Sequence, residues 1–489
     1  IDVVPTEEII GEFLPLLFPG YQVVSKGMFR ITRNTDVEIE EDEADDLLEA
    51  VRDSVTRRQW GGVVRLETEH GMPSNLTEFI IQKMKLKPFQ VYSVKGPMAF
   101  AGYMALNDLD YPKLKDTPYF ASFNPDTQPV DKLFENIAKR DILLYHPYQT
   151  FTSVVDLVQQ AAKDPAVLGI KMTLYRVGNN SPIVKALMEA RQRGKQVTAV
   201  VELKARFDEE RNINWAEELE RAGVNVVYGF AGLKIHAKLC LVVRREPKGM
   251  RRYAHIGTGN YNASSAKIYT DLGLFTARDD ICSDVQDLFN VMTGFGVIDN
   301  YRRIFVSPNH LRANITRLIR EEAEIHRAKG GGRIIMKCNQ LVDQGIVREL
   351  YEASRAGVKI ECVVRGICSL RPGIKNVSET ISVHSIVGEL LEHARIYYFE
   401  HGGEPVMYVG SADMMTRNLN GRIEVLTPVL DKKLMDNILK QIVNPQLADN
   451  THAWELLSDG SYKKIKREAG VAAMDSQSHI KRVLNLLKR

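Results

Sequence analysis

The stretch that decides the fold is LMEARQRGKQVTAVVE at residues 187–202, because a related stretch, LYEASRAGVKIECVVR, returns at 350–365. Each copy has a helical pattern, a glycine that ends it and then a β-rich apolar run. Further along, KIHAKL at 234–239 and LEHARI at 391–396 each carry a histidine, at positions 236 and 393. The ordered return of helix, strand and histidine predicts an internal duplication.

Outward from this repeat, strand-like runs alternate with amphipathic helices, which predicts an α/β fold. The predicted strands of the first copy are 167–176, 197–203, 224–229 and 235–243, and its helices are 182–194 and 214–223. The region before it is predicted to be α+β, with a helix over 39–56 whose acidic start and basic end match the helix dipole. Residues 111–131 carry turn-forming proline and aspartate and are expected to be a connection.

These patterns predict an α+β head domain at 1–122, which we expect to be incomplete, and two α/β domains at 123–303 and 304–489. The chain begins IDVVPTEE, without an initiator methionine or a signal-peptide pattern, so we expect it to be the remainder of a longer protein. No apolar run approaches the ~18 residues of a membrane-spanning helix.

Composition is that of an ordinary globular protein, with 44% hydrophobic and 26% charged residues among 489. The five cysteines form no CxxC pair, which argues against a disulfide framework or a structural zinc site and favours reduced thiols inside the cell. The net charge of +3 argues against a general nucleic-acid binder. A polyanionic substrate remains compatible with it where positive charges converge locally.

Two histidines carry the chemistry that we expect of this chain. On a strand, residues i and i+2 share a face, so His236 is predicted to project with Lys238, and His393 with Arg395. A lone histidine on a strand is more often structural. Two histidines at matched positions of a duplication, each followed by a cation, point instead to a shared functional site.

A second strand follows each histidine strand and ends in a turn of small residues. The first turn is Gly257-Thr-Gly-Asn260 and the second is Gly410-Ser-Ala-Asp413. Glycine allows a phosphate to approach the backbone closely, and an asparagine amide donates to its oxygens. Gly330–Arg333 is a weaker phosphate-loop candidate because it opens a strand rather than a helix, and the chain has no GxxxxGK[ST] motif.

The duplicated HxK motif with its G-x-x-N turn resembles the phospholipase D superfamily. The segments LYRVGNNSPIV, ELKARFDEERNI, GLKIHAKL, GTGNYN, YTDLGL, VVRGICSLRPGI, HSIVGELLEHARIYYF and SADMMTRNL together resemble the polyphosphate kinase family over essentially the whole chain. The resemblance implies two phospholipase D-like α/β domains that share one active site behind a head domain. It also implies reversible transfer of the ATP γ-phosphate to the end of an inorganic polyphosphate chain through a phosphohistidine.

Residue roles follow from the same resemblance. It implies that His236 is the phosphorylated nucleophile, that His393 is the second active-site histidine, and that Lys238 and Arg395 assist catalysis. The expected ATP- and phosphate-binding residues are Tyr269, Arg365, His393 and Asn260. The family's magnesium–phosphate positions fall on Arg176 and Arg206. Since a guanidinium has no lone pair to offer Mg²⁺, we expect these arginines to grip phosphate oxygens that hold the metal.

The nucleophile must be a neutral imidazole. With an ordinary pKa near 6.5, most such groups are neutral at pH 7. Burial or cations such as Lys238 would raise that neutral fraction further.

The second copy departs from the superfamily pattern. Arg395 replaces the lysine, and Asp413 stands where Asn260 stands in the first copy, so we expect the two halves to be inequivalent. A carboxylate there suits an orienting or proton-transfer partner of His393. The family's N-terminal helical domain, which supplies an asparagine to ATP, is also expected to be missing, and we expect this to impair nucleotide affinity or assembly.

The expected partners are ATP or ADP and inorganic polyphosphate, with no nucleic acid. The resemblance further implies a homo-oligomer in the cytoplasm that can associate peripherally with the inner face of the membrane. One alternative is a phospholipase D-like phosphodiesterase acting on phospholipid or DNA. Another is a catalytically impaired polyanion-binding fragment, whose candidate basic residues are better interpreted as a solvated hairpin: Arg244, Arg245, Lys248, Arg251 and Arg252.

Overall fold

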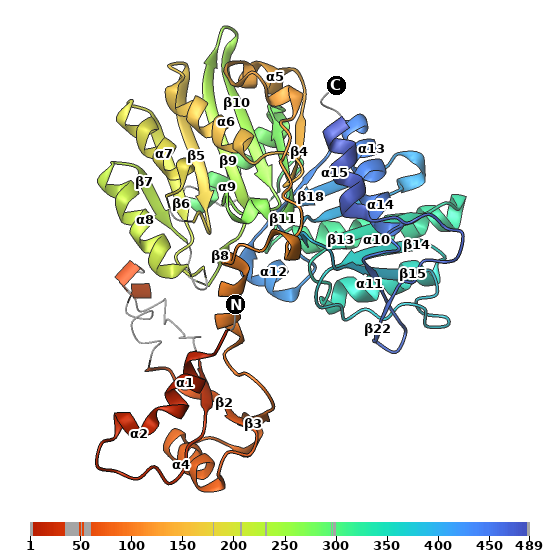
Figure 1. Cartoon of the computed structure of the whole chain (residues 1–489). Coiled ribbons are helices and arrows are strands. Elements are labelled where there is room, and N and C mark those ends of the chain that lie inside the picture. The colour runs from red at the N-terminus through yellow and green to blue at the C-terminus, as the bar shows by residue number, and fades with distance from the viewer. Residues whose placement is uncertain are drawn as a thin grey trace. The chain divides into compact units, whose positions relative to one another are not determined.

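The computed structural model describes residues 3–34, 48–49, 51–52, 60–178, 180–205, 208–229, 232–294, 296 and 300–486. The chain divides into two compact units, Ile1–Thr117 and Pro118–Arg489, which are coloured red to orange and orange to blue in Figure 1. Most of the helix predicted over 39–56 lies outside the described residues. In the described part of the chain, no helix combines the length and apolar character needed to cross a bilayer.

The first unit is α+β, as predicted. Its sheet has the order β1-β2-β3, with the strands Phe29–Arg33, Val63–Glu69 and Val91–Val94, and its longest helix is α4 (Ser74–Met84). Leu66 of β2 and Ile80 of α4 are buried against each other in a small core. Two short helices, α1 (Thr6–Glu12) and α2 (Leu14–Leu17), precede the sheet.

The first half of the second unit is a mixed sheet of order β11-β10-β9-β5-β6-β7, with β4 on the far side of β11. The strands are β4 (Ile142–His146), β5 (Val167–Leu174), β6 (Gln196–Val201), β7 (Asn225–Tyr228), β9 (Lys238–Glu246), β10 (Gly249–Gly257) and β11 (Tyr269–Thr276). The helices are α5 (Leu133–Lys139), α6 (Thr152–Lys163), α7 (Pro182–Gln192), α8 (Glu209–Arg221) and α9 (Asp279–Met292).

The second half repeats this topology with the order β12-β20-β18-β17-β13-β14-β15-β21-β22. The strands are β12 (Phe305–Val306), β13 (Arg333–Cys338), β14 (Lys359–Val364), β15 (Ile381–Ile386), β17 (Ile396–Phe399), β18 (Val406–Gly410), β20 (Val425–Pro428), β21 (Ala453–Leu456) and β22 (Tyr462–Lys464). The run β10-β9-β5-β6-β7 matches β18-β17-β13-β14-β15, which confirms the duplication. The helices are α10 (Leu311–Lys329), α11 (Gln344–Arg355), α12 (Thr416–Gly421), α13 (Lys432–Ile438), α14 (Asn444–Leu447) and α15 (Ser476–Leu486).

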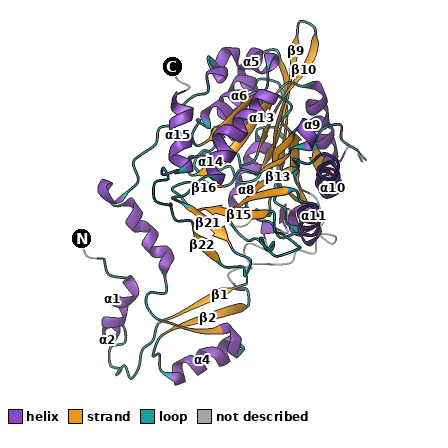
Figure 2. Ribbon diagram, turned by 90° about the vertical axis from the view of Figure 1, so that its right-hand side faces the viewer, coloured by secondary structure: helices purple, strands orange, loops and turns teal. Residues whose placement is uncertain are grey.

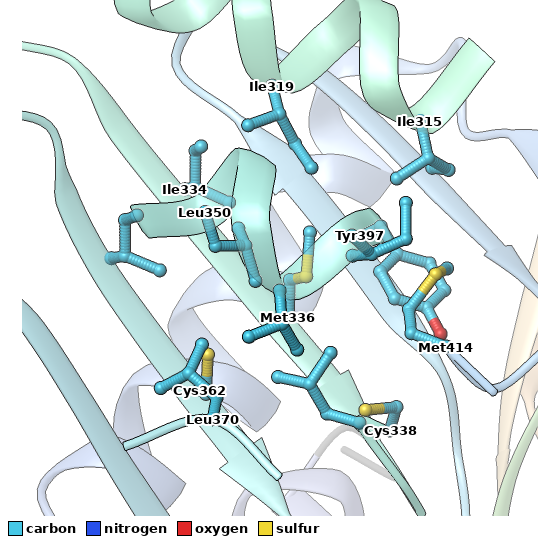
Figure 3. Close-up of a cluster of buried hydrophobic side chains, with 14 of the residues drawn as sticks. Ile315, Ile319, Ile334, Met336, Cys338, Leu350, Cys362, Leu370, Tyr397 and Met414 are labelled. Carbon is cyan, nitrogen blue, oxygen red and sulfur yellow. The ribbon is translucent and has the colours of Figure 1, made fainter. Parts of the chain in front are cut away.

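Apolar spacing explains how helices cover this second sheet (Figure 2). Ile315 and Ile319 lie four residues apart on α10, so they occupy the same helix face and are fully buried. Figure 3 shows both side chains facing the apolar residues of β13, among them Ile334 and Met336. At the start of α11 the side chain of Asp343 caps the helix by accepting the Ile346 N–H at 3.1 Å.

Each half also lends a short strand to the other half. β16 (Leu391–Glu392), from the second half, pairs in parallel with the start of β11 in the first half. In return β8 (Lys234–Ile235) of the first half pairs in parallel with β19 (Arg422–Ile423) of the second. The short strand immediately before each histidine is therefore tied to the opposite half by backbone hydrogen bonds.

This exchange corrects the predicted continuous strand at 235–243. The strand breaks at His236 and Ala237, because β8 pairs with β19 while β9 pairs with β5 and β10. A change of partner at this point turns the backbone, so His236 and Lys238 do not lie on one face of a single strand. The segment around His393 breaks in the same way between β16 and β17. The basic residues 244–252 do form the hairpin of β9 and β10, where Arg244 pairs with Asp164.

Candidate active site

Backbone hydrogen bonds from the opposite half hold both histidines. The N–H groups of His236 and Ala237 each donate to the carbonyl oxygen of Ile423 at 2.9 Å. The N–H group of His393 donates to the hydroxyl oxygen of Thr270 at 3.1 Å. The backbone at each histidine is thus hydrogen-bonded to a strand of the opposite half.

A carboxylate from the opposite half orients each imidazole ring. Nδ1 of His236 lies 2.8 Å from Oε2 of Glu424, and Nδ1 of His393 lies 2.8 Å from Oδ1 of Asp271. With Nδ1 of His236 engaged, its Nε2 is the ring nitrogen left to face a substrate. Nε2 of His393 lies 3.2 Å from Nη1 of Arg395. Sequence reasoning missed both carboxylates, although TDLGL at 270–274 and IEVLT at 423–427 place them at the same position of the two copies.

The two carboxylates are themselves fixed by hydrogen bonds. Oε1 of Glu424 accepts from the Asn418 amide at 2.7 Å, and its backbone N–H donates to the Ser307 hydroxyl at 3.1 Å. Oδ1 of Asp271 accepts from the Thr258 hydroxyl at 2.6 Å. Burial raises the pKa of Glu424 to about 7, because the loss of water around its enclosed carboxyl group outweighs the opposing charges of Lys238 and Arg422.

Burial also holds His236 in its neutral form. It lowers the pKa of His236 well below the ordinary value, and the nearby charges of Lys238, Arg422, Arg395 and His393 lower it further. The prediction that burial and cations favour the neutral imidazole is confirmed. The charges of His393 and Arg395 act on His236, so the two histidines are close enough for one to influence the protonation of the other. Burial, followed by Arg395, likewise lowers the pKa of His393.

The two cations that follow the histidines are buried in the same site. Lys238 donates to the carbonyl oxygen of His236, and its ammonium lies 5.3 Å from the centre of the Tyr175 ring. Burial lowers the pKa of Lys238 well below its ordinary value. Arg395 donates at 3.0 Å to the carbonyl oxygens of both Thr258 and His393. Arg395 therefore connects the two halves directly beside the second histidine.

Asp413 does not orient His393, contrary to the expectation from sequence. Its carboxylate accepts from Arg395, with Nη2 at 3.1 Å from Oδ2, and from the backbone N–H of Asn339 at 2.7 Å. Arg395 donates to both oxygens of this carboxylate, from Nε to Oδ1 and from Nη2 to Oδ2, which is the geometry that a planar guanidinium favours. The orienting contact with His393 comes from Asp271 instead.

An aromatic ring packs edge-on against each histidine. The ring centres of Tyr175 and His236 are 5.0 Å apart, and those of Tyr269 and His393 are 5.2 Å apart. Tyr269 was predicted from the resemblance, whereas Tyr175 was not. These rings restrict rotation of the imidazoles and shield one side of each from water.

The remaining predicted residues occupy different positions around this centre. Arg365 donates from Nε to the Asn339 side chain at 2.9 Å, and burial followed by Arg395 lowers its pKa. Oδ1 of Asn260 is buried and has no hydrogen-bond partner among the described residues. Arg176 forms an ion pair with Asp208 at 3.1 Å and lies against the Tyr175 ring. Arg206 lies outside the described residues.

The donor set of this site suits phosphate better than a directly bound metal. Within the described ranges, no three His, Cys, Asp or Glu side chains are grouped to hold a metal ion. The carboxylates of Glu424, Asp271 and Asp413 each bind a histidine or an arginine. A divalent cation would therefore have to reach this centre on the oxygens of a phosphate chain.

Two α/β halves of matching topology, each with a histidine followed two residues later by a cation, define a duplicated α/β protein with a pair of site histidines. Family models narrow this class further: the polyphosphate kinase middle domain matches residues 1–106, C-terminal domain 1 matches 132–298 and C-terminal domain 2 matches 304–477. The chain belongs to the polyphosphate kinase family.

Individual relatives agree with this assignment. The chain is 49% identical over 463 residues to polyphosphate kinase 1 of Chlorobaculum tepidum and 48% identical over 473 residues to the polyphosphate kinase of Prosthecochloris aestuarii. These matches cover 95% and 96% of the chain but 66% of the length of each relative. The crystal structure of polyphosphate kinase from Porphyromonas gingivalis matches with a TM-score of 0.84 at 33% identity, covering 98% of this chain and 70% of that one.

Proposed function

We propose that this chain carries the catalytic apparatus of an ATP:polyphosphate phosphotransferase, with a head domain at 1–122 and catalytic domains at 123–303 and 304–489. The observation that carries the proposal is the buried, neutral His236, whose Nδ1 faces Glu424 in a site also lined by His393, Lys238 and Arg395. Family membership supplies the substrates, ATP and inorganic polyphosphate.

In the first step, Nε2 of His236 attacks the γ-phosphorus of ATP. The N–P bond forms as the bond between the γ-phosphorus and the β,γ-bridging oxygen breaks, and ADP leaves with that electron pair. Glu424 supports the attack because its carboxylate accepts the Nδ1 proton and stabilises the positive charge that develops on the ring. A histidine nucleophile is already neutral near pH 7, so the step needs no separate strong base.

In the second step, a terminal oxygen of the polyphosphate chain attacks the phosphorus on His236. The P–O bond forms as the N–P bond breaks, and Glu424 returns the proton to Nδ1, so the imidazole is released in its neutral form. His393, oriented by Asp271, acts on the transferring group as a proton donor or acceptor or as a hydrogen-bond donor to its oxygen. The same steps in reverse return a phosphoryl group to ADP.

The cations hold the phosphate chains in line. Phosphoryl transfer depends mainly on positioning and charge neutralisation, and each charge-assisted hydrogen bond contributes about 1.5–3 kcal/mol. Lys238, Arg395 and Arg365 supply this charge close to the histidines, and the family resemblance adds Arg176 and Arg206 to the residues that bind phosphate. Mg²⁺ bound to the phosphate oxygens would neutralise further charge. Tyr269 and Asn260 complete the predicted contacts to nucleotide and phosphate.

The test of this proposal is chemical trapping of the intermediate. On incubation with γ-labelled ATP, the protein is expected to take up label that is stable to alkali and labile to acid, and polyphosphate is expected to chase that label into polymer. His236→Ala should abolish the labelling, whereas His70→Ala, which changes an exposed histidine of the head domain, should leave it intact. Label retained in His236→Ala would remove His236 as the nucleophile.

Three further predictions rest on the family alone: assembly into a homo-oligomer, a cytoplasmic location, and peripheral association with the membrane. Sedimentation of the purified protein, alone and with anionic vesicles, measures the first and the last.

A further inference from the structure

A fully buried carboxylate lies directly behind the second histidine. Glu392, the residue before His393, forms an ion pair with Lys337 at 2.6 Å, and both side chains are 2% exposed. Its Oε2 also accepts from the Thr270 hydroxyl at 3.0 Å and the Gln446 amide at 2.8 Å. An enclosed charge of this kind is tolerated only when its oxygens are fully hydrogen-bonded. The network is therefore sensitive to the loss of any one donor.

The other oxygen of this carboxylate depends on the C-terminal helix. Among the described residues, Oε1 of Glu392 receives one hydrogen bond, from the amide of Gln477 on α15 at 2.9 Å. The same amide group donates to the carbonyl oxygen of Leu390 at 2.9 Å, and its Oε1 accepts the N–H of Leu390 at 2.9 Å. Gln477 thus pairs with the backbone of this segment as a neighbouring strand would.

The polypeptide before His393 is consequently held from two sides. On one side β16 pairs with β11, and Thr270 of β11 accepts the His393 N–H while donating to Glu392. On the other side stands Gln477. Its amide fills the space over Gly388, where a Cβ atom would lie 2.4 Å from the glutamine oxygen. Side-chain volume at position 388 would therefore displace the amide.

The helix itself is well anchored in the fold. Ile480 is fully buried, and Leu484 is 7% exposed, in the same core cluster as Ala394 and Ile396, which flank Arg395. Ser476 at its start donates its backbone N–H to Asp449 at 2.8 Å. Figure 1 shows α15 beside α14, which supplies Gln446 to the same carboxylate. The end of the chain is thereby connected to the active site through two amide side chains.

We propose that Gln477 is a positioning residue for His393 and that it acts through Glu392 and the backbone of residues 390–393. Only the expected effect of Gln477 on turnover rests on the proposed function. Without the amide, Glu392 lacks a donor on Oε1 and the segment is released on one side. The ring of His393 then loses its fixed geometry relative to Asp271 and to the phosphoryl group on His236.

The main test compares Gln477→Leu with Ile480→Val. The leucine side chain has a similar size but cannot form the three hydrogen bonds, whereas the valine removes one methylene from the same buried helix face and leaves them intact. We expect kcat for polyphosphate synthesis to fall about tenfold or more in Gln477→Leu, with KM for ATP changed less than twofold. Ile480→Val should keep kcat within twofold of wild type. Equal losses of kcat in both variants, or an unchanged kcat in Gln477→Leu, would overturn the proposal.

A second variant gives a pH signature that a purely structural role would not produce. Gln477→Glu introduces a carboxyl group that donates to Glu392 only when it is protonated. Its kcat relative to wild type is therefore expected to rise at least threefold as the pH falls from 8 to 6. A constant ratio across this range would contradict the proposal.

A readout that does not need turnover separates this inference from the proposed function. In protein with ¹⁵N-labelled histidine, the NMR signals of His393, assigned from His393→Gln, should shift in Gln477→Leu and stay in place in Ile480→Val. If the His393 signals shift in this way but the wild-type protein makes no polyphosphate, the proposed function is refuted and the positioning role of Gln477 still holds. Unmoved His393 signals in an active protein would refute the positioning role alone.

Discussion

At the scale of single residues, the site is two histidine–carboxylate pairs with different surroundings. His236 with Glu424 has Lys238 beside it, whereas His393 with Asp271 has Arg395, which is itself engaged by Asp413. An ammonium that donates to a carbonyl oxygen, as Lys238 does, can turn towards a phosphate, whereas a guanidinium paired with a carboxylate, as Arg395 is, stays in place. This difference favours His236 as the residue that carries phosphorus and His393 as its fixed partner.

The pKa of Glu424 predicts a pH dependence. Because this pKa is raised to about 7, the carboxylate that accepts the Nδ1 proton of His236 forms only as the pH rises through that value. We expect the rate of phosphohistidine formation, measured by rapid quench, to increase with pH through about 7. Glu424→Gln should remove this increase and slow the step by roughly 10²-fold, a typical contribution of acid–base catalysis.

The matched control is Glu404→Gln, which alters a largely exposed glutamate paired with Lys432. Its pH profile should equal that of wild type. A Glu424→Gln enzyme that keeps the rise near pH 7 would mean that another group titrates there.

Gly259 offers a second test at this scale. A Cβ atom at this position would lie 2.1 Å from Oδ2 of Asp271, so Gly259→Ala must displace the carboxylate that orients His393. We expect kcat to fall about tenfold, equivalent to ~1.4 kcal/mol in the barrier. Steady-state assays of ATP consumption measure this effect, and Gly62→Ala, where the added atom meets open space, is the control. Full activity in Gly259→Ala would show that Asp271 is dispensable.

At the scale of elements, the exchanged strand pairs explain why the histidine strands break. β8 and β16 are each two residues long and pair only with the opposite half. Apolar alternation predicted continuous strands here, because Ile235, Ala237 and Leu239 are all buried. The apolar pattern reports which residues are buried but not which strand they pair with, so it could not predict the break at His236 and Ala237.

Ser307 tests the importance of β19. Its hydroxyl donates to the Arg422 carbonyl oxygen at 2.8 Å and accepts the Glu424 N–H at 3.1 Å, so it ties β19 to the start of β20. Ser307→Ala leaves these buried groups unpaired, at a cost of about 1–3 kcal/mol. We expect urea unfolding to show this loss and phosphohistidine formation to slow about tenfold.

Ser461→Ala, in which an exposed serine loses its bond to Asp459, is the control for both measurements. A Ser307→Ala protein that loses stability but labels His236 at the wild-type rate would show that β19 does not position Glu424.

At the scale of the whole second unit, neither half holds a complete site. Glu424 of the second half orients His236 of the first, and Asp271 of the first orients His393 of the second. Separately produced fragments 1–303 and 304–489 are therefore expected to form no phosphohistidine from labelled ATP. Mixing the folded fragments should restore labelling if they associate through the exchanged strands. Labelling of fragment 1–303 alone at the rate of the intact chain would contradict this dependence.

The sequence by itself determined the α/β class, the duplication and the two histidines with their cations. Those features are local or repetitive: periodicity follows burial along one element, and the repeat keeps motifs in order. Only the tertiary structure decided that the halves exchange strands, that Asp271 rather than Asp413 orients His393, and that Gln477 reaches the same segment. These contacts join residues 85 to 188 positions apart, and no local pattern of side chains encodes which distant partner a buried carboxylate meets.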